Sequence, residues 1–151
     1  MFTAVVEGAE ELAHDWVNVR AAVRAGMRRG VSMGVKEGAA EAKARHRFKN
    51  RTGNLERSIV GEVTGSSDDE HRGQIVAWRK YASIVEHGRG PVEAKRAKTL
   101  HFFIGGQEFF RRRVGPATAL PFMGIAYLKC EAVMIREIEI GIANAQVILS
   151  R

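Results

Sequence analysis

The sequence predicts an α+β fold in which a small antiparallel β-sheet with hairpins and a short helix lies between two long helices. Three observations support this fold class. Between residues 12 and 42, apolar side chains recur every three or four positions, which is the spacing of a helix. Residues 57–114 instead hold short apolar and polar alternations between turn clusters, which is typical of strands. After residue 121 no proline occurs and the helical spacing returns.

Length and composition predict one globular domain over residues 1–151. The apolar fraction of 45% and the charged fraction of 27% are those of an ordinary soluble protein. No run approaches the ~20 apolar residues that a membrane span needs, and the N-terminus lacks the features of a signal peptide. Cys130 is the only cysteine, which excludes an internal disulfide and fits a reducing site of synthesis.

The first long helix carries two series of side chains. One is an apolar stripe of Leu12, Trp16, Val19, Val23, Met27, Val31, Val35, Ala39 and Ala42. The other places a glycine at every fourth position: Gly26, Gly30, Gly34 and Gly38. A glycine inside a helix costs about 1 kcal/mol relative to alanine, so four in register predict a helix-packing face that another backbone approaches closely. That backbone belongs either to this chain's own sheet or helix, or to another subunit.

The ends and interruptions of this first helix are less sharply defined. Residues 2–6 suit either its first turn or a separate short strand. Residues 15–18 are a candidate break.

The middle of the chain is divided by turn signals. Residues 50–54 form a turn cluster, followed by expected strands at 57–64 and 73–80 with a polar, mobile loop between them. Residues 81–88 predict a short helix that ends at Gly88. Residues 89–99 predict a flexible basic loop, and residues 100–114 a hairpin that turns at Gly105 and Gly106.

The last helix is expected to have Pro121 at its first position. It carries two apolar stripes. The first consists of Phe122, Ile125, Ala126, Val133, Ile140 and Val147, and the second of Leu128, Ala132, Ile135, Ile142 and Leu149. A helix that is apolar on two sides needs cover on two sides, and in so small a domain we expect another subunit to supply part of it.

No catalytic or metal-binding pattern is present in the sequence. Glu86 and His87 are adjacent, so in a helix their side chains point about 100° apart and do not converge. The other histidines, His14, His46, His71 and His101, lack metal-ligand spacing. Cys130 lies in an apolar helix, which favours a buried small hydrophobe over a nucleophile. We therefore expect no enzyme, no cofactor and no metal.

The net charge of +7 and the pI of about 10.1 indicate nucleic acid or an acidic partner. The charge alternates in blocks, because residues 20–57 are basic while residues 1–19 and 58–70 are acidic. Such blocks suit contacts between copies or neighbouring proteins, although DNA binders show them too. Arg111, Arg112 and Arg113 follow two phenylalanines, but neighbouring strand residues face opposite sides, so a charged edge strand is the alternative to a DNA-binding surface.

Three motifs occur together in one order: RTGNLERSI at 51–59, YASIVEHG at 81–88 and LPFMGIAY at 120–127. In these motifs the chain resembles the neck and tail-completion family of long-tailed bacteriophages, small minor tail components. The resemblance covers about residues 45–127. The family hallmarks are a Thr-Gly-x-Leu turn that opens the first strand, a Tyr-Ala segment and a Pro-Phe entry to the last helix. They fall on Thr52, Gly53 and Leu55; on Tyr81, Ala82, Val85, Glu86 and Gly88; and on Pro121 and Phe122.

The resemblance implies a non-catalytic structural protein of the head–tail connector, which joins or closes the capsid portal and the tail tube. Its partners would be further copies in a ring, a hexamer rather than a dodecamer, and the adjacent connector and tail tube proteins. It would reside in the virion, at the neck or the top of the tail, after assembly in the bacterial cytoplasm. A neck ring and a tail terminator both remain open.

In this interpretation Glu86 is structural and pairs with a base such as Arg51, while His87 faces solvent. Arg51 and the arginines at 111–113 would contact partner proteins or, weakly, genomic DNA in the channel. The alternative function is a basic DNA-binding accessory protein. A third hypothesis, an enzyme, would require Glu86 to meet His46 or His101 in one pocket.

Overall fold

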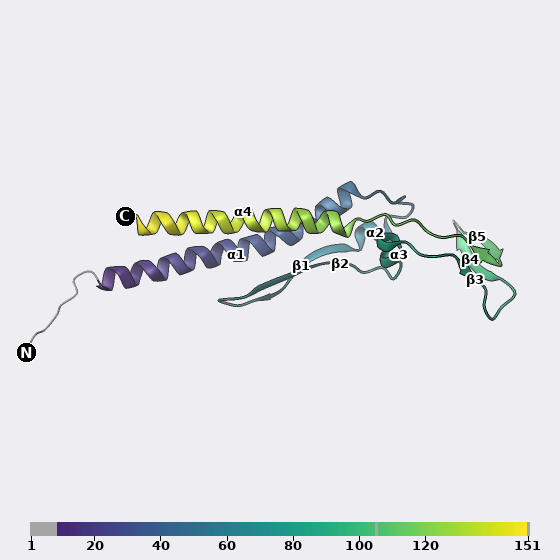
Figure 1. Cartoon of the computed structure of the whole chain (residues 1–151), viewed down its shortest axis with the longest axis horizontal. Coiled ribbons are helices and arrows are strands. Elements are labelled where there is room, and N and C mark those ends of the chain that lie inside the picture. The colour runs from purple at the N-terminus through teal and green to yellow at the C-terminus, as the bar shows by residue number, and fades with distance from the viewer. Residues whose placement is uncertain (1–8, 105, 151) are drawn as a thin grey trace, which may run out of the picture.

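The computed structural model describes residues 9–104 and 106–150, and it confirms the predicted α+β class (Figure 1). Residues 2–6 and Gly105, on which two of the sequence predictions fall, lie outside the described residues. The elements in chain order are α1 (Ala9–Arg45), α2 (Asn54–Arg57), β1 (Ile59–Ser66), β2 (His71–Ala77), α3 (Ala82–His87), β3 (Val92–Glu93), β4 (Leu100–Ile104), β5 (Gln107–Arg111), β6 (Arg113–Val114) and α4 (Met123–Leu149).

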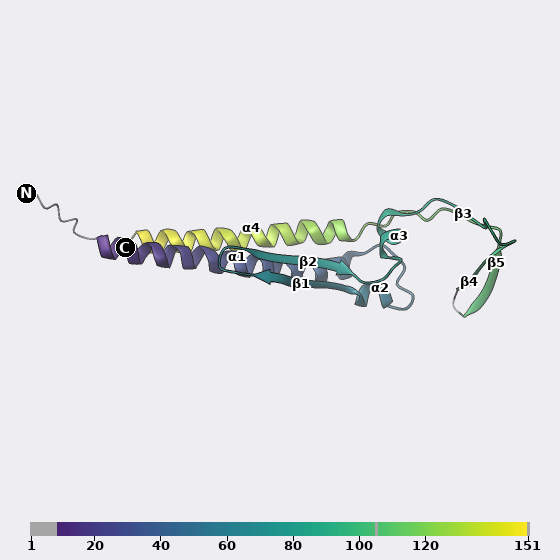
Figure 2. The ribbon, with the colours of Figure 1, turned by 90° about the horizontal axis from the view of Figure 1, so that it is seen from below.

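The molecule is elongated, with α1 and α4 side by side in opposite directions (Figures 1 and 2). The hairpin of β1 and β2 packs along α1, so α1 contacts both α4 and the hairpin. Close backbone approach makes this possible. A Cβ atom on Gly61 of β1 would collide with the backbone of Val35 in α1, and one on Gly73 of β2 would lie 2.6 Å from a methyl group of Val35.

α1 is one uninterrupted helix, so the predicted break at residues 15–18 is wrong. This segment contains neither glycine nor proline. The amide of Asn18 lies 3.0 Å from the ring of His14 one turn earlier, a contact that only a continuous helix allows.

The strands β1 and β2 confirm the predicted pair, but they reach further into the polar segment than the sequence indicated. Ile59 pairs with Ala77 and Ser66 with His71, with a register shift between Val63 and Gly65. The connecting turn is therefore reduced to residues 67–70. It is closed by a hydrogen bond from the N–H of Ser67 to the carbonyl of Glu70. Instead of one small antiparallel sheet, the described residues form three separate two-stranded antiparallel ladders.

The core lies where the C-terminal end of α1, the two short helices, β1 and the first turn of α4 meet. Its buried members are Ala39, Ala42, Phe48, Leu55, Ile59, Ala82, Phe122 and Ala126. The rings of Phe48 and Phe122 meet edge to face with their centroids 5.3 Å apart, a favourable aromatic geometry. The first and last helices are thus joined at this end of the molecule.

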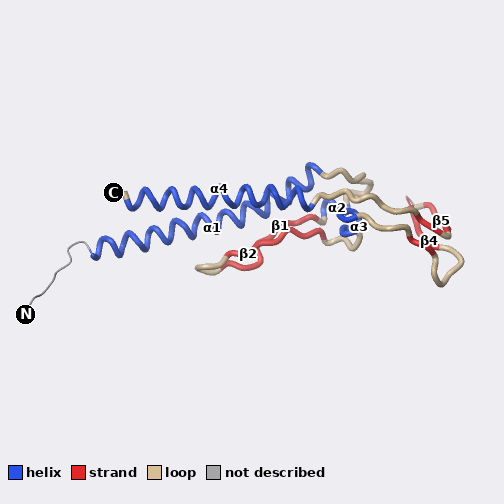
Figure 3. Tube along the Cα trace, in the orientation of Figure 1, coloured by secondary structure: helices blue, strands red, loops and turns tan. Residues whose placement is uncertain are grey.

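Residues 89–120, which we term the arm, extend beyond this core and consist mainly of strand and loop (Figure 3). The hairpin of β4 and β5 confirms the prediction for residues 100–111, and Gly106 in its turn has a φ of 84°. The chain then bends at Arg112, and Arg113 in β6 pairs with Glu93 in β3. The predicted flexible loop at 89–99 is therefore partly ordered as a strand.

Pro121 lies two residues before α4, whose first helical residue is Met123, so the prediction placed the helix start too early. Phe122 is the N-cap and is completely buried. The Pro-Phe pair anchors the entry of the helix in the core.

Candidate functional site

Glu86 lies at the end of α3 and caps the N-terminus of α4. Its Oε2 atom accepts hydrogen bonds from the backbone N–H groups of Phe122, at 2.7 Å, and Met123, at 3.0 Å. The first N–H groups of a helix have no partner within the helix and carry partial positive charge, so a carboxylate is well suited to them. The expected ion pair of Glu86 with Arg51 is wrong, because Arg51 is exposed and the carboxylate is engaged by α4. His87 is exposed, as predicted.

The Thr-Gly turn folds as a left-handed residue followed by a short helix. Gly53 has a φ of 67°, and its N–H donates a 2.8 Å hydrogen bond to Oδ1 of Asn50. This conformation favours glycine. The turn leads into α2, which buries Leu55, whereas Thr52 stays exposed. The strand begins at Ile59, two residues later than predicted.

The Tyr-Ala segment forms the base of the arm. Tyr81 precedes α3 and is 43% exposed, whereas Ala82 is buried. Gly88 ends α3 with a φ of 71°, and a Cβ atom there would lie 2.6 Å from the carbonyl oxygen of Ala117. Glycine therefore lets the segment that returns from the arm pass directly against the end of this helix.

The glycine series of α1 lies against α4 of the same chain. Cβ atoms at Gly26, Gly30, Gly34 and Gly38 would fall 2.6–3.1 Å from backbone or side-chain atoms of α4. The added Cβ of Gly26 would lie 2.9 Å from the Cα of Gly141, itself a glycine of α4. The internal contact thus explains the four glycines without a second subunit.

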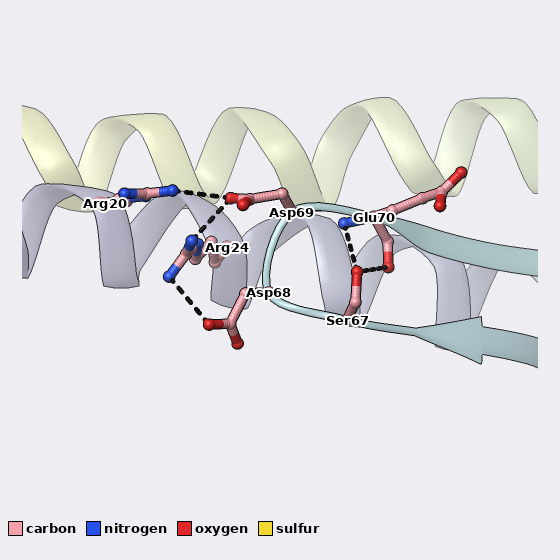
Figure 4. A network of polar contacts seen from close by, with 6 residues as sticks. All are labelled: Arg20, Arg24, Ser67, Asp68, Asp69 and Glu70. Atoms are coloured by element: carbon pink, nitrogen blue, oxygen red, sulfur yellow. Dashed lines mark hydrogen bonds and ion pairs between the residues drawn. The ribbon is translucent and has the colours of Figure 1, made fainter.

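The turn between β1 and β2 is fixed to α1 by ion pairs (Figure 4). Oδ1 of Asp69 lies 3.0 Å from Arg20 and 2.6 Å from Arg24, and Asp68 lies 3.8 Å from Arg24. A hydrogen bond from Arg24, which has the largest effect, and one from Arg20 hold the pKa of Asp69 below its usual value. The predicted mobile loop is therefore docked, and part of the charge alternation is satisfied within one chain.

α4 is covered on one side only. Val133, Glu137 and Gly141 are buried toward α1. The second predicted stripe remains exposed. Its large members, which we term the outer ridge, are Leu128 (66% exposed), Ile135 (51%), Ile142 (44%) and Leu149 (49%). The described residues thus leave a long apolar helix face without cover.

The arm adds further exposed apolar surface. Phe103 is 65% exposed and Phe110 52%. The tip of the hairpin curls back toward the Thr-Gly turn (Figure 2), and Phe103 and Ile104 line a groove of about 320 Å³ together with Tyr81. The arm therefore presents an aromatic side chain next to the Thr-Gly turn and to Tyr81 of the Tyr-Ala segment.

A family model described as "Bacteriophage HK97-gp10, putative tail-component" matches residues 9–88, which are 80 of the 151 residues. The chain belongs to this phage tail-component family. The match confirms the resemblance seen in the sequence and contains the Thr-Gly turn and the Tyr-Ala segment, whereas Pro121 and Phe122 lie beyond it. Neither the comparison with curated proteins nor the comparison with solved structures gave a match.

The three consecutive arginines at 111–113 of this tail component have different surroundings. The guanidinium of Arg111 lies 6.0 Å from the ring centroid of Phe109, and Nε of Arg113 lies 3.4 Å from the carboxylate of Glu93. Arg112 is exposed at the bend between their two strands. Their role in partner or DNA contacts stays a prediction.

The residues of the enzyme hypothesis have separate partners in this gp10-like chain. Glu86 binds the amides of α4, the ring of His46 stacks on Phe48 at 3.8 Å, and His101 lies 2.6 Å from Glu108. Among the described residues, no group of three or more histidine, cysteine or acidic side chains could hold a metal ion. No helix in the described ranges is long and apolar enough to cross a membrane.

Cys130 is partly buried against α1, and burial raises the pKa of its thiol. An added Cβ on Gly34 would lie 3.1 Å from its sulfur atom. A raised pKa disfavours the reactive thiolate, which agrees with a packing role.

Proposed function

We propose that this tail component is a structural protein of the phage head–tail connector, a ring that joins or closes the capsid portal and the tail tube. The proposal covers both a neck ring and a tail terminator, and it places the protein in the virion. Membership of the family supports a tail role, and a hexamer is the expected ring.

The observation that carries the proposal is the outer ridge of α4. Apolar patches of this kind on a protein surface mark contacts with other proteins. The chain's own helix α1 covers the other side of α4 and no described residue covers the ridge, which favours cover by another molecule. A protein that completes its apolar surface by assembly is the kind of component from which a connector is built.

The proposal is tested in a phage or prophage that lacks the corresponding gene. We expect its lysates to contain filled heads and separate tails, and purified protein to restore infectious particles. Protein with Ile135→Asp, which changes only an exposed position of the ridge, should fail to restore them. Joined and infectious particles in the absence of the protein would contradict the connector function.

The runner-up function is a basic DNA-binding accessory protein. The net charge of +7 and the exposed Arg51 and Arg112 favour it. A DNA binder of this kind should take up a short duplex in the micromolar range, and its affinity should fall steeply with salt because bound counterions are released. Binding that is absent at about 150 mM salt would leave the connector as the better account.

A further inference from the structure

The outer ridge of α4 is regular along its whole length. Leu128, Ile135, Ile142 and Leu149 follow one another at intervals of seven residues. Seven residues are close to two helical turns, so the four side chains line one side of the helix over about 30 Å. Val133, Glu137 and Gly141 face α1, so the ridge lies on the side of α4 that points away from the rest of the body.

A bare apolar groove occurs on the N-terminal half of α1. It has a volume of about 510 Å³ and is lined by Trp16, Val19, Arg20, Val23, Arg24, Met27, Asp68 and Asp69. Trp16 is 57% exposed and Met27 39%. Further along the same stripe, Val31 and Val35 are buried beneath the β1–β2 hairpin. The groove is thus the part of the core stripe that the hairpin is too short to cover.

Unpaired charges of opposite sign lie beside the ridge and beside the groove. Glu131 and Glu139 lie on the exposed side of α4, and neither takes part in an ion pair within the described part of the chain. Arg20 and Arg24 in the groove are already paired with Asp69. The exposed Arg28, in the adjoining pocket, takes part in no ion pair among the described residues. Glu139 can therefore meet Arg28 when the helices pack side by side.

We propose that the outer ridge of one copy packs into the α1 groove of a second copy. Ridge and groove are different surfaces, one on α4 and the other on α1, so the contact is head to tail. A contact of this type repeats from copy to copy, and it closes into a ring when the rotation between neighbours allows. The inference deepens the proposed function, on which it rests for the ring, by naming the two faces that join the subunits.

Cross-linking between two differently tagged variants tests the contact. One carries Ile135→Cys and the other Met27→Cys, both with Cys130→Ala so that no native thiol competes. After mixing and mild oxidation we expect a disulfide-linked species that contains both tags. The control partner carries Trp78→Cys, at a 65% exposed position outside the groove, and should yield at least tenfold less product.

The failure of this interface can be told apart from the failure of the connector function. An oligomer that cross-links Ile135→Cys to itself would show a symmetric ridge-to-ridge contact and overturn the inference while the ring survives. An oligomer with neither product would overturn it as well. A ridge bound only by a tail tube protein, with no contact between copies, would also contradict the inference, whereas the head–tail joining assay tests the function separately.

Charge reversal provides an independent measurement. Glu139→Arg should weaken self-association at least tenfold, and the added substitution Arg28→Glu should restore most of it. Both positions are exposed, so circular dichroism should show an unchanged fold. A double variant as weak as the single variant would contradict the pairing of these two surfaces.

Discussion

At the scale of single residues, Glu86 shows how a motif that suggests chemistry serves architecture. The adjacent Glu86 and His87 resemble an acid and base pair in sequence, yet the carboxylate is directed at two backbone amides and the imidazole at solvent. The bond links α3 to α4 across 36 positions of the chain. The short helix at the base of the arm is thereby tied to the start of the last helix.

Glu86→Ala should lower the free energy of unfolding by about 1–2 kcal/mol, because the N–H of Phe122 loses its partner in a buried place. Glu86→Gln keeps an acceptor oxygen but loses the charge, so its loss should be about half as large. Urea unfolding followed by circular dichroism measures both. His87→Ala, at the exposed neighbour, is the control and should stay within about 0.5 kcal/mol of the wild type. An equally small effect of Glu86→Ala would refute the capping role.

Asp69 supplies a pH-dependent contact between the β1–β2 turn and α1. Its pKa in the folded protein is lowered by hydrogen bonds from Arg24 and Arg20. The stabilising contribution is therefore complete above the unfolded value of 3.8 and is lost as the pH falls through the lower folded pKa. The contact is exposed, so added salt should weaken it.

We expect the fluorescence of Trp16, which lines the same groove as Asp69, to change with a midpoint below pH 3.8. The titration is carried out with Trp78→Phe, so that Trp16 is the only tryptophan. Asp69→Asn should remove the transition. A midpoint above 3.8 would show that Asp69 is not held by the two arginines.

At the scale of the elements, α1 and α4 pack through glycines, which bring the two backbones close together, rather than through interlocking side chains. Glycines of both helices lie against each other where Gly26 contacts Gly141. Each glycine lowers helix stability by about 1 kcal/mol, and the close packing of the two backbones must offset this cost. The exposed Gly124 has no such contact, so the two kinds of glycine can be compared within one helix pair.

Gly38→Ala should destabilise the protein by about 1–3 kcal/mol, since the new methyl group would lie 2.6 Å from the carbonyl oxygen of Ala126. Gly124→Ala has open space around the new methyl group and should instead stabilise α4 by about 0.4–1 kcal/mol. Thermal and urea unfolding compare the two variants. If both raised stability, the close contact between the helices would not exist in solution.

Elements with a local signal could be predicted from the sequence. The periodicity of α1 and α4 and the turn glycines at Gly53 and Gly88 indicated helices, hairpins and caps, because these depend on neighbouring residues. Gly61 gave no such signal, since its need for glycine arises only when β1 lies on α1. The capping by Glu86 and the ion pairs of Asp69 were missed for the same reason. Each joins residues that are far apart in the chain and depends on the tertiary fold.

At the scale of the whole molecule, the chain is a long body with an arm at one end (Figure 1). The main cluster of buried side chains lies at the junction between them. Apolar side chains on the outer ridge, in the α1 groove and on the arm remain exposed. This distribution suits a component whose surfaces are completed by its neighbours. In the connector that we propose, the body would face other copies and the arm another connector or tail protein.

Phe103→Ser should leave the free energy of unfolding within about 0.5 kcal/mol of the wild type, because this arm side chain is 65% exposed. We expect it to reduce the joining of heads and tails at least tenfold in the complementation assay. Trp78→Ser, at an equally exposed position on the body, is the matched control and should join particles normally. Normal joining by Phe103→Ser would show that this surface of the arm is not needed to join heads and tails.

Native mass spectrometry of the purified protein, with and without a short DNA duplex, tests the central claim most directly. The connector account predicts a discrete ring, a hexamer in preference to a dodecamer, whose mass is the same with and without the duplex. A monomer that binds the duplex would contradict the account and establish the DNA-binding alternative.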